Sequence, residues 1–232
     1  MPVVKANAYG HGLEEVAKAL EKAGATWCGV ARMEEALMLR SAGIGMKILV
    51  LGYVSPQRIA DALNQNVSLT LYDFSVAEEY ARQAKNLNKK LSIQVKVDTG
   101  MGRLGIPCEQ AMRLIQMVKS TPEFSLEAVF THFACADEPE KPYTNEQLTR
   151  FKGLVDEMGR NGIRPSMIHA ANSAAAINFP GSRYDLVRCG LAVYGISPSD
   201  STALPSGIKP AMAWKTRLIS LKELPANHTH IF

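Results

Sequence analysis

Short apolar runs alternate with amphipathic stretches along the chain as far as Gly195. The run KILVLG at residues 47–52 has no polar alternation, which is typical of a strand that is buried on both faces. Residues 13–23 instead place apolar side chains at helical spacing and end at Gly24, which predicts an amphipathic helix. We expect strands at residues 3–6, 27–31, 47–52, 68–72, 91–97, 126–133, 167–171 and within 186–194, and helices at 13–23, 34–41, 55–63, 76–86, 109–119, 145–159 and from 173 onward.

This order of elements predicts an α/β fold of the TIM type, a (β/α)8 barrel. Strands that are separated by helices pair in parallel through right-handed crossovers, and eight such strands close a barrel. A doubly wound open sheet is the alternative, although no GxGxxG motif follows the first strand to support a dinucleotide fold. A chain of 232 residues, 47% hydrophobic, can form such a core without disulfides or metals.

The pattern changes after the predicted barrel, which we assign to residues 1–196. Residues 197–211 are rich in Ser, Pro and Gly and indicate a linker. Residues 212–224 alternate weakly, which predicts a strand, and we interpret 212–232 as the start of a carboxy-terminal β domain. The chain also begins inside a predicted strand, so we expect both ends to be truncated.

Charge and cysteine content exclude several classes of function. The net charge of +4 is spread along the chain without a long basic run, so we expect no nucleic-acid partner. No apolar run approaches the length of about 20 residues that spans a membrane, and no signal peptide is evident, which predicts a cytoplasmic protein. The four cysteines form no CxxC pair and are expected to be reduced. We expect no metal site, including at His228 and His230.

Polar side chains gather where the predicted strands end. In a barrel the reactive residues lie at the carboxy ends of the strands, and buried charges are costly unless they are paired. Each residue alone is weak evidence, because a single lysine or histidine has ordinary structural uses, but the set converges on one mouth of the barrel. The set comprises Lys5, Tyr9, Lys96, Arg103, Thr131, His132, His169, Asn172, Ser173, Arg188 and Gly190.

Five blocks in this set carry a resemblance to a known family. They are VVKANAYGHG at 3–12, KVDTGMGRLG at 96–105, FTHFACADE at 130–138, HAANSAA at 169–175 and VRCGLAVYG at 187–195. In this order they resemble the alanine racemases, enzymes of fold type III that depend on pyridoxal 5'-phosphate (PLP). The resemblance extends from residue 3 to about residue 226.

The resemblance implies a cofactor site. Lys5 would form the Schiff base with PLP, and Tyr9 would hydrogen-bond its phosphate. Ser173, together with backbone groups around Asn172, Gly190 and Leu191, would hold the rest of the phosphate. Arg188 would face the pyridine nitrogen, with His169 behind it.

The resemblance also implies a substrate site for alanine. Arg103 would lie near the phenolic oxygen of PLP and the substrate carboxylate. Lys96 corresponds to a lysine that is carbamylated in some members, while the alternative is a buried ammonium that pairs with Asp98. Lys5 would be one catalytic base, and His132 would pair with the second.

The implied reaction interconverts L-alanine and D-alanine and supplies D-alanine for peptidoglycan, in a homodimer. The family's second base is a tyrosine early in the carboxy-terminal domain, and none of the seven tyrosines of this chain occupies that position. We therefore expect this chain to be inactive or weakly active and its dimer to be doubtful.

Three other functions remain open on the sequence. The first is a non-catalytic PLP-binding barrel, although the YGHG and MGRLG blocks resemble the racemases more closely. The second is a PLP decarboxylase of the same barrel superfamily, which would need a cysteine-bearing carboxy-terminal domain. The third is a phosphate-binding barrel enzyme that uses Lys5 to form a Schiff base with a sugar.

Overall fold

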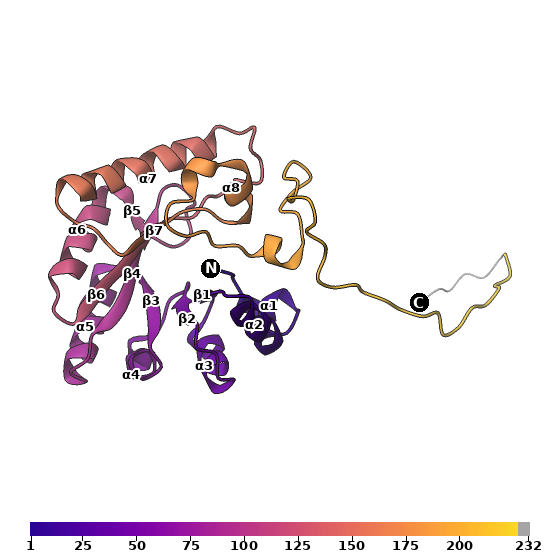
Figure 1. The fold of residues 1–232 in the computed structure, drawn as a ribbon, viewed down its shortest axis with the longest axis horizontal. Helices are drawn as coiled ribbons and strands as arrows, with labels where there is room; N and C mark the ends of the chain where they lie inside the picture. The colour runs from indigo at the N-terminus through magenta and orange to yellow at the C-terminus, as the bar shows by residue number, and fades with distance from the viewer. Residues whose placement is uncertain (227–232) are drawn as a thin grey trace.

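The apolar runs between residues 27 and 171 form the strands of one parallel sheet. The computed structural model describes residues 1–226, and its strands follow the order β1-β2-β3-β4-β6-β7 (Figure 1). Their bounds are β1 Trp27–Val30, β2 Lys47–Val50, β3 Val67–Leu71, β4 Leu91–Asp98, β6 Phe124–Phe130 and β7 Met167–His169. A short strand that the sequence analysis missed, β5 (Ile106–Pro107), pairs with the end of β4.

The amino terminus closes this sheet into a barrel. Val3 pairs in parallel with Gly29 of β1, and Pro2 pairs in parallel with Cys189. On the other side, Arg188 N donates to Ala171 O, just beyond β7, at 2.9 Å. The predicted TIM-type barrel is therefore confirmed, and the doubly wound open sheet is excluded because its edges would remain apart.

Helices cover the outside of the barrel (Figure 1). They begin where the sequence supplies a suitable first turn: Asp73 accepts a hydrogen bond from Val76 N at the start of α5, and Pro56 opens the turn before α4. The bounds are α2 Leu13–Lys22, α3 Met33–Ser41, η1 Pro56–Arg58, α4 Ile59–Asn64, α5 Phe74–Asn86, α6 Cys108–Ser120, α7 Tyr143–Arg160, α8 Ser173–Asn178, η2 Pro180–Ser182 and η3 Leu191–Tyr194.

The core lies between the strands and these helices. All five residues of β3 are buried, as expected for a strand with both faces covered. Helix α6 buries Ala111, Leu114, Ile115 and Val118, which lie at the i, i+3, i+4 and i+7 positions of one face. The core thus fixes the strands, and the polar residues at their ends are held by a rigid frame.

The two ends of the predicted barrel differ from the expectation. The strand expected at residues 3–6 is limited to the single pairs made by Pro2 and Val3, so Lys5 does not lie in a strand but starts α1 (Lys5–Tyr9). The strand expected within residues 186–194 is likewise reduced to the pairing of Cys189, and the 3-10 turn η3 follows it. A periodicity of apolar residues does not distinguish a strand from a short, tightly packed turn.

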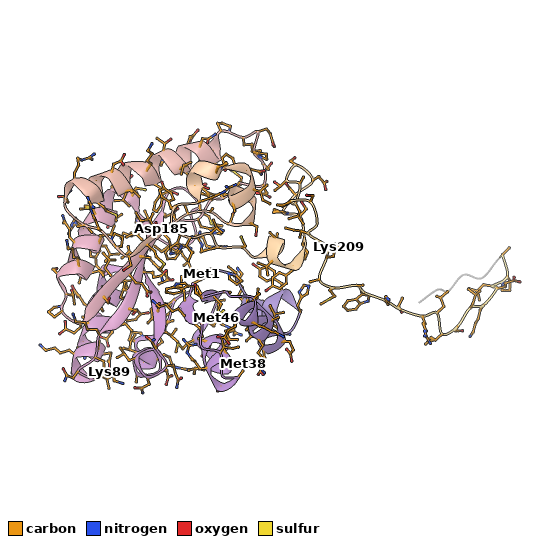
Figure 2. All side chains as sticks on the ribbon, in the orientation of Figure 1. Met1, Met38, Met46, Lys89, Asp185 and Lys209 are labelled. Atoms are coloured by element: carbon orange, nitrogen blue, oxygen red, sulfur yellow. The ribbon has the colours of Figure 1, made fainter. Side chains whose placement is uncertain are left out.

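Residues 212–224 form no strand, contrary to the prediction. Their backbone is extended, and Trp214 and Ile219 are 91% and 99% exposed. Figure 2 shows the side chains beyond Lys209 standing clear of the barrel. A strand needs a neighbour to take its backbone hydrogen bonds, and no neighbour lies beside this segment within residues 1–226. The domain boundaries at 196 and 211 stay predictions.

The first part of the predicted linker packs against the barrel. Thr202 is fully buried, and Ser199 Oγ donates to the carbonyl of Asp137 at 2.5 Å. Residues 197–202 are therefore fixed beside the loop after β6. Within residues 1–226, none of the helices is both long enough and apolar enough to cross a lipid bilayer.

Candidate functional site

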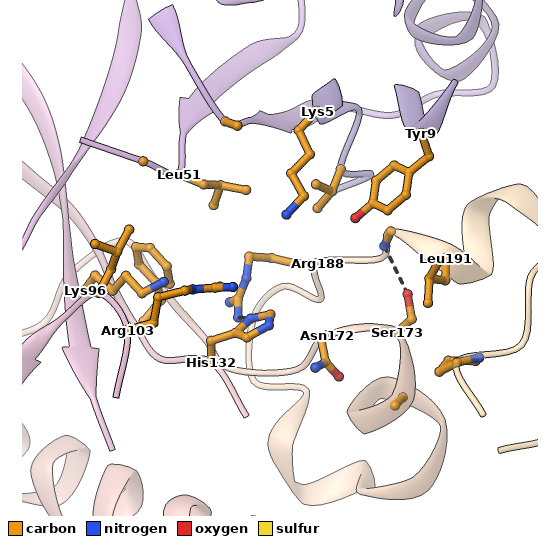
Figure 3. Close-up of a pocket in the computed structure, with 18 of the residues that line it drawn as sticks. Lys5, Tyr9, Leu51, Lys96, Arg103, His132, Asn172, Ser173, Arg188 and Leu191 are labelled. Atoms are coloured by element: carbon orange, nitrogen blue, oxygen red, sulfur yellow. Dashed lines mark hydrogen bonds between the residues drawn. The ribbon is translucent and has the colours of Figure 1, made fainter. Parts of the chain in front are cut away.

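The carboxy ends of the strands surround a cavity of about 410 Å³, a volume in the range of small-molecule sites. Figure 3 shows side chains from several elements pointing into it. Predicted site residues that line it are Lys5, Tyr9, Lys96, Arg103, His132, Asn172, Ser173, Arg188, Gly190 and Leu191. His169 is fully buried and lies behind Arg188 instead.

The cavity also has lining residues that the sequence analysis did not single out. Leu51 and Gly52 follow β2, and Asp137 lies in the loop after β6. The rule that site residues follow the strands would have found the first two, had it been applied to apolar residues. Asp137 lies within the FTHFACADE block, so only its role was overlooked.

Lys5 and Tyr9 reach the same cavity because the chain between them turns in a left-handed helix. Ala6, Asn7, Ala8 and Tyr9 have φ angles of 52°, 54°, 52° and 56°. This conformation costs roughly 1–2 kcal/mol per residue, so the surroundings must hold it. Glu35 Oε1 accepts a hydrogen bond from Ala6 N at 2.7 Å, and Glu35 Oε2 accepts one from Ala31 N at 2.7 Å.

Replacing Ala6 with glycine is expected to stabilise the chain, although glycine normally destabilises a helix. The exchange removes a left-handed penalty of roughly 1–2 kcal/mol and adds an entropic cost of roughly 0.5–1 kcal/mol. The free energy of unfolding in urea should therefore rise by about 0.5–1 kcal/mol. Ala19→Gly in the exposed face of α2 is the matched control and should lower it by about 1 kcal/mol. A loss of stability in Ala6→Gly equal to that of the control would contradict the left-handed turn.

Tyr9, Ser173 and Gly190 form one corner of the cavity. Ser173 Oγ accepts hydrogen bonds from Gly190 N at 3.0 Å and from Ala192 N at 3.3 Å. A Cβ on Gly190 would lie only 2.5 Å from Tyr9 Oη, so glycine is required for this close approach. Burial raises the pKa of Tyr9, and its hydroxyl therefore stays protonated and able to donate. This corner offers hydroxyl and N–H groups to an anion such as a phosphate.

Arg188 lies at the floor of the cavity, held by four hydrogen bonds. Its Nη2 donates to Thr131 O at 2.5 Å and Ala170 O at 2.8 Å, and contacts His132 Nδ1 at 3.2 Å. Its Nη1 donates to His169 Nδ1 at 2.7 Å. Burial lowers the pKa of Arg188 to about 9, so the guanidinium keeps its charge at neutral pH.

The two histidines beside Arg188 are neutral. Burial, reinforced by Arg188, lowers the pKa of His132 to about 2. The same causes hold the pKa of His169 well below its ordinary value. Each imidazole can therefore offer a lone pair to the guanidinium.

Lys96 is buried in the wall of the cavity. Its Nζ lies 5.5 Å from the centre of the Phe130 ring, and burial, followed by Arg188 and Arg103, lowers its pKa to about 8. The alternative ion pair with Asp98 is not formed among residues 1–226. Asp98 Oδ1 instead accepts from the N–H groups of the loop that leads to Arg103, including Gly100 N at 2.8 Å.

These groups fit PLP. Lys5 would supply an amine for its aldehyde, the Tyr9–Ser173–Gly190 corner would supply donors for its phosphate, and Arg188 would supply a charged donor for its ring nitrogen. Cationic side chains of Lys5, Lys96, Arg103 and Arg188 outnumber the carboxylate of Asp137 at the cavity, as an anionic cofactor and an amino-acid carboxylate would require. In the part of the chain that the structure describes, no three His, Cys, Asp or Glu side chains gather as a metal site would need; His228 and His230 lie outside it.

The sequence of this chain is similar to those of known alanine racemases. Residues 1–198 match the family described as "Alanine racemase, N-terminal domain". An alanine racemase of Symbiobacterium thermophilum is 43% identical over 229 residues, which cover 99% of this chain and 61% of that protein. One of Desulforamulus reducens is also 43% identical, and the match covers 97% of this chain and 61% of the relative.

Solved structures give the same result. An alanine racemase of Clostridium difficile 630 superposes with a TM-score of 0.83 at 39% identity, over 87% of this chain and 53% of that one. An alanine racemase from a D-cycloserine-producing Streptomyces lavendulae superposes with a TM-score of 0.86 at 37% identity, over 91% and 56% of the two chains. The present chain spans about 61% of the length of the curated relatives named above. The barrel, its cavity and these matches together show that the chain belongs to the alanine racemase family, as its amino-terminal barrel domain.

Proposed function

We propose that this chain is the PLP-binding part of an enzyme that interconverts L-alanine and D-alanine. One observation carries the proposal: Lys5, the Tyr9–Ser173–Gly190 corner and Arg188 converge on a single cavity. An amine for the aldehyde, donors for the phosphate and a partner for the ring nitrogen, here the guanidinium of Arg188, are the groups that would hold PLP. The names of the relatives support alanine as the substrate.

Each residue has a distinct task in this proposal. PLP, when bound through its aldehyde, withdraws electrons from the α-carbon of an amino acid and so makes the α-proton acidic. Lys5 would anchor it and then carry that proton at Nζ. Tyr9 and Ser173 would hold the phosphate together with backbone groups of Asn172, Gly190 and Leu191.

Arg188 would face the pyridine nitrogen with a group that does not readily give up its proton. Since burial lowers its pKa only to about 9, the guanidinium donates a hydrogen bond at neutral pH but remains a cation. The nitrogen beside it would stay unprotonated and withdraw electrons only moderately. A racemase gains from this, because fewer side reactions compete with return of the proton.

Arg103 and Lys96 would serve the substrate side. Arg103 lies at the cavity and can pair with the carboxylate of alanine. Lys96 would react with carbon dioxide as its neutral amine, forming an N–C bond and releasing a proton to give a carbamate. A pKa of about 8 makes that amine available near neutral pH, and the resulting anion would attract Arg103.

His132 would pair with a second proton carrier and would not itself be the base. Its pKa of about 2 leaves it a weak acceptor, and its Nδ1 already contacts Arg188. Inversion at the α-carbon needs a proton carrier on each side. In our proposal Lys5 serves one side, and a tyrosine of a partner subunit serves the other.

The proposal extends to the setting of the whole protein. It would act in the cytoplasm as a homodimer and supply D-alanine for peptidoglycan. The four cysteines are all free, which suits a reducing compartment. The exposed apolar side chains between Trp214 and Leu224 suit a surface that packs against another domain.

Exchange of the α-proton tests this proposal directly. We would incubate the chain with PLP and either L-alanine or D-alanine in D2O, and follow the α-proton signal by ¹H NMR. Lys5 alone should exchange the α-proton of one enantiomer, at least about 10²-fold faster than PLP without protein. The other enantiomer should exchange much more slowly.

The control and the contrary outcome use the same assay. Lys18→Ala changes an exposed lysine of α2 whose one ion pair within residues 1–226 is with Glu14, and should exchange as the unaltered chain does. Firm binding of PLP without exchange of either enantiomer would favour the non-catalytic PLP-binding barrel instead.

A further inference from the structure

A continuous line of hydrogen bonds leads away from Arg188 into the barrel. Arg188 Nη1 lies 2.7 Å from His169 Nδ1, and His169 Nε2 lies 3.0 Å from Gln94 Oε1. Gln94 Nε2 donates to Glu127 Oε2 at 2.9 Å, and Ser68 Oγ donates to the same oxygen at 2.6 Å. The line therefore joins five side chains through four hydrogen bonds.

This line crosses the barrel from its mouth toward the opposite end. His169 is the last residue of β7, whereas Gln94 lies in the middle of β4. At the far end, Glu127 Oε1 is 3.6 Å from the ammonium of Lys47, the first residue of β2. Gln94 and His169 are fully buried, so water cannot replace any partner along the middle of the line.

Glu127 at one end of the line and Arg188 at the other both determine which nitrogen of His169 carries the proton. The Glu127 carboxylate can only accept, so the amide nitrogen of Gln94 faces it and the amide oxygen faces His169. That oxygen requires a proton on His169 Nε2. Arg188 can only donate, so it requires a lone pair on Nδ1. Both requirements select the same neutral tautomer of His169.

The amide of Gln94 also keeps the negative charge away from His169. A carboxylate in direct contact with an imidazole stabilises its doubly protonated form, and that form has no lone pair for Arg188. Burial, Arg188, the amino terminus of Met1 and Lys96 all act to lower the pKa of His169. Because the acceptor at position 94 is uncharged, it does not counteract these effects, and the pKa of His169 stays low.

We propose that Gln94 is a positioning residue. Its amide donates to Glu127 and accepts from His169 Nε2, so that His169 stays neutral and keeps a lone pair on Nδ1 for Arg188. The value of this position for catalysis rests on the proposed function, in which Arg188 faces the cofactor ring. The hydrogen-bonding claim itself concerns only the protein and can be measured without the cofactor.

The test uses ¹⁵N NMR of the cofactor-free chain with labelled histidine and arginine. The His169 nitrogen shifts report its tautomer and charge, and exchange of the Arg188 Nη protons with water reports its hydrogen bonds. His169→Gln identifies the His169 signals. Three variants are compared with the unaltered chain: Gln94→Leu removes the hydrogen bonds, Gln94→Glu adds a charge, and Lys47→Met alters only the exposed end.

We expect His169 in the unaltered chain to be neutral and protonated on Nε2 from pH 6 to pH 9. Gln94→Leu should accelerate exchange of the Arg188 protons about tenfold, the equivalent of one lost hydrogen bond. In Gln94→Glu, a proton shared with Glu127 should preserve the original pattern at pH 6. At pH 9 that proton should be lost, and the charged carboxylate at position 94 should then accept from His169 Nε2 and shift the His169 ¹⁵N signals. Lys47→Met should stay within about twofold of the unaltered chain.

A proton on His169 Nδ1 in the unaltered chain would overturn the proposal. So would unchanged Arg188 exchange in Gln94→Leu, unchanged His169 signals in Gln94→Glu at pH 9, or an equal acceleration in Lys47→Met. Titration of the unaltered chain with PLP separates this proposal from the proposed function. If His169 has the expected form but PLP does not bind, the proposed function fails and the positioning of Arg188 stands.

Discussion

Lys5→Ala is expected to abolish exchange of the alanine α-proton beyond the rate of free PLP. Lys5 has two tasks in our account, as the cofactor's anchor and as the proton carrier, and one substitution removes both. General acid–base catalysis alone contributes typically about 10²–10⁴-fold, so the loss should be at least of that order. The measurement is the decay of the α-proton signal in D2O with the favoured enantiomer.

Lys96→Met separates the role of Lys5 from a general loss of positive charge. Lys96 lines the same cavity, and its replacement removes one cation but neither the anchor nor the proposed proton carrier. We expect Lys96→Met to retain covalent attachment of PLP, which Lys5→Ala should lose. A Lys5→Ala chain that exchanges within tenfold of the unaltered chain would contradict the assignment.

The 232-residue chain is expected to invert alanine about 10²–10⁴-fold more slowly than the racemase of Symbiobacterium thermophilum, the range that one general acid or base contributes. Among the described residues that line the cavity, Tyr9 is assigned to the phosphate, and His132 has a pKa of about 2. Neither would serve as a second proton carrier. Inversion of L-alanine can be measured by oxidising the D-alanine formed with D-amino-acid oxidase. The Symbiobacterium thermophilum racemase, which is 43% identical, provides the reference rate.

Inversion within tenfold of that reference would contradict this expectation. His132 would then be the first alternative base, since it lies beside Arg188 at the cavity. His132→Gln keeps a hydrogen-bonding side chain but cannot accept and return a proton. If His132 were the base, His132→Gln would abolish inversion and leave exchange of one enantiomer intact.

The apolar pattern correctly predicted those strands and helices of the barrel that bury a continuous apolar face. The run at 47–52 became β2 (Lys47–Val50), and the periodic stretch 109–119 became α6 (Cys108–Ser120). These elements follow from burial alone, so local sequence was sufficient. The rule that site residues follow the strands also brought Lys96, His132 and Arg188 to one cavity.

The pattern failed where distant contacts decide the backbone. The left-handed turn after Lys5 is held by Glu35, a residue 29 positions away, and no local preference of Ala6 or Ala8 indicates it. Gln94 was missed for a related reason. It was one polar residue inside a predicted strand, and its importance depends on Glu127 and His169, which lie on other strands.

The most direct test of the central claim is reduction of the PLP-loaded chain with borohydride, followed by proteolysis and mass spectrometry. Our account predicts a single pyridoxyl group, attached to Lys5 in the peptide that contains Ala6 to Tyr9. Attachment to Lys96 or any other lysine, with Lys5 unmodified, would contradict it.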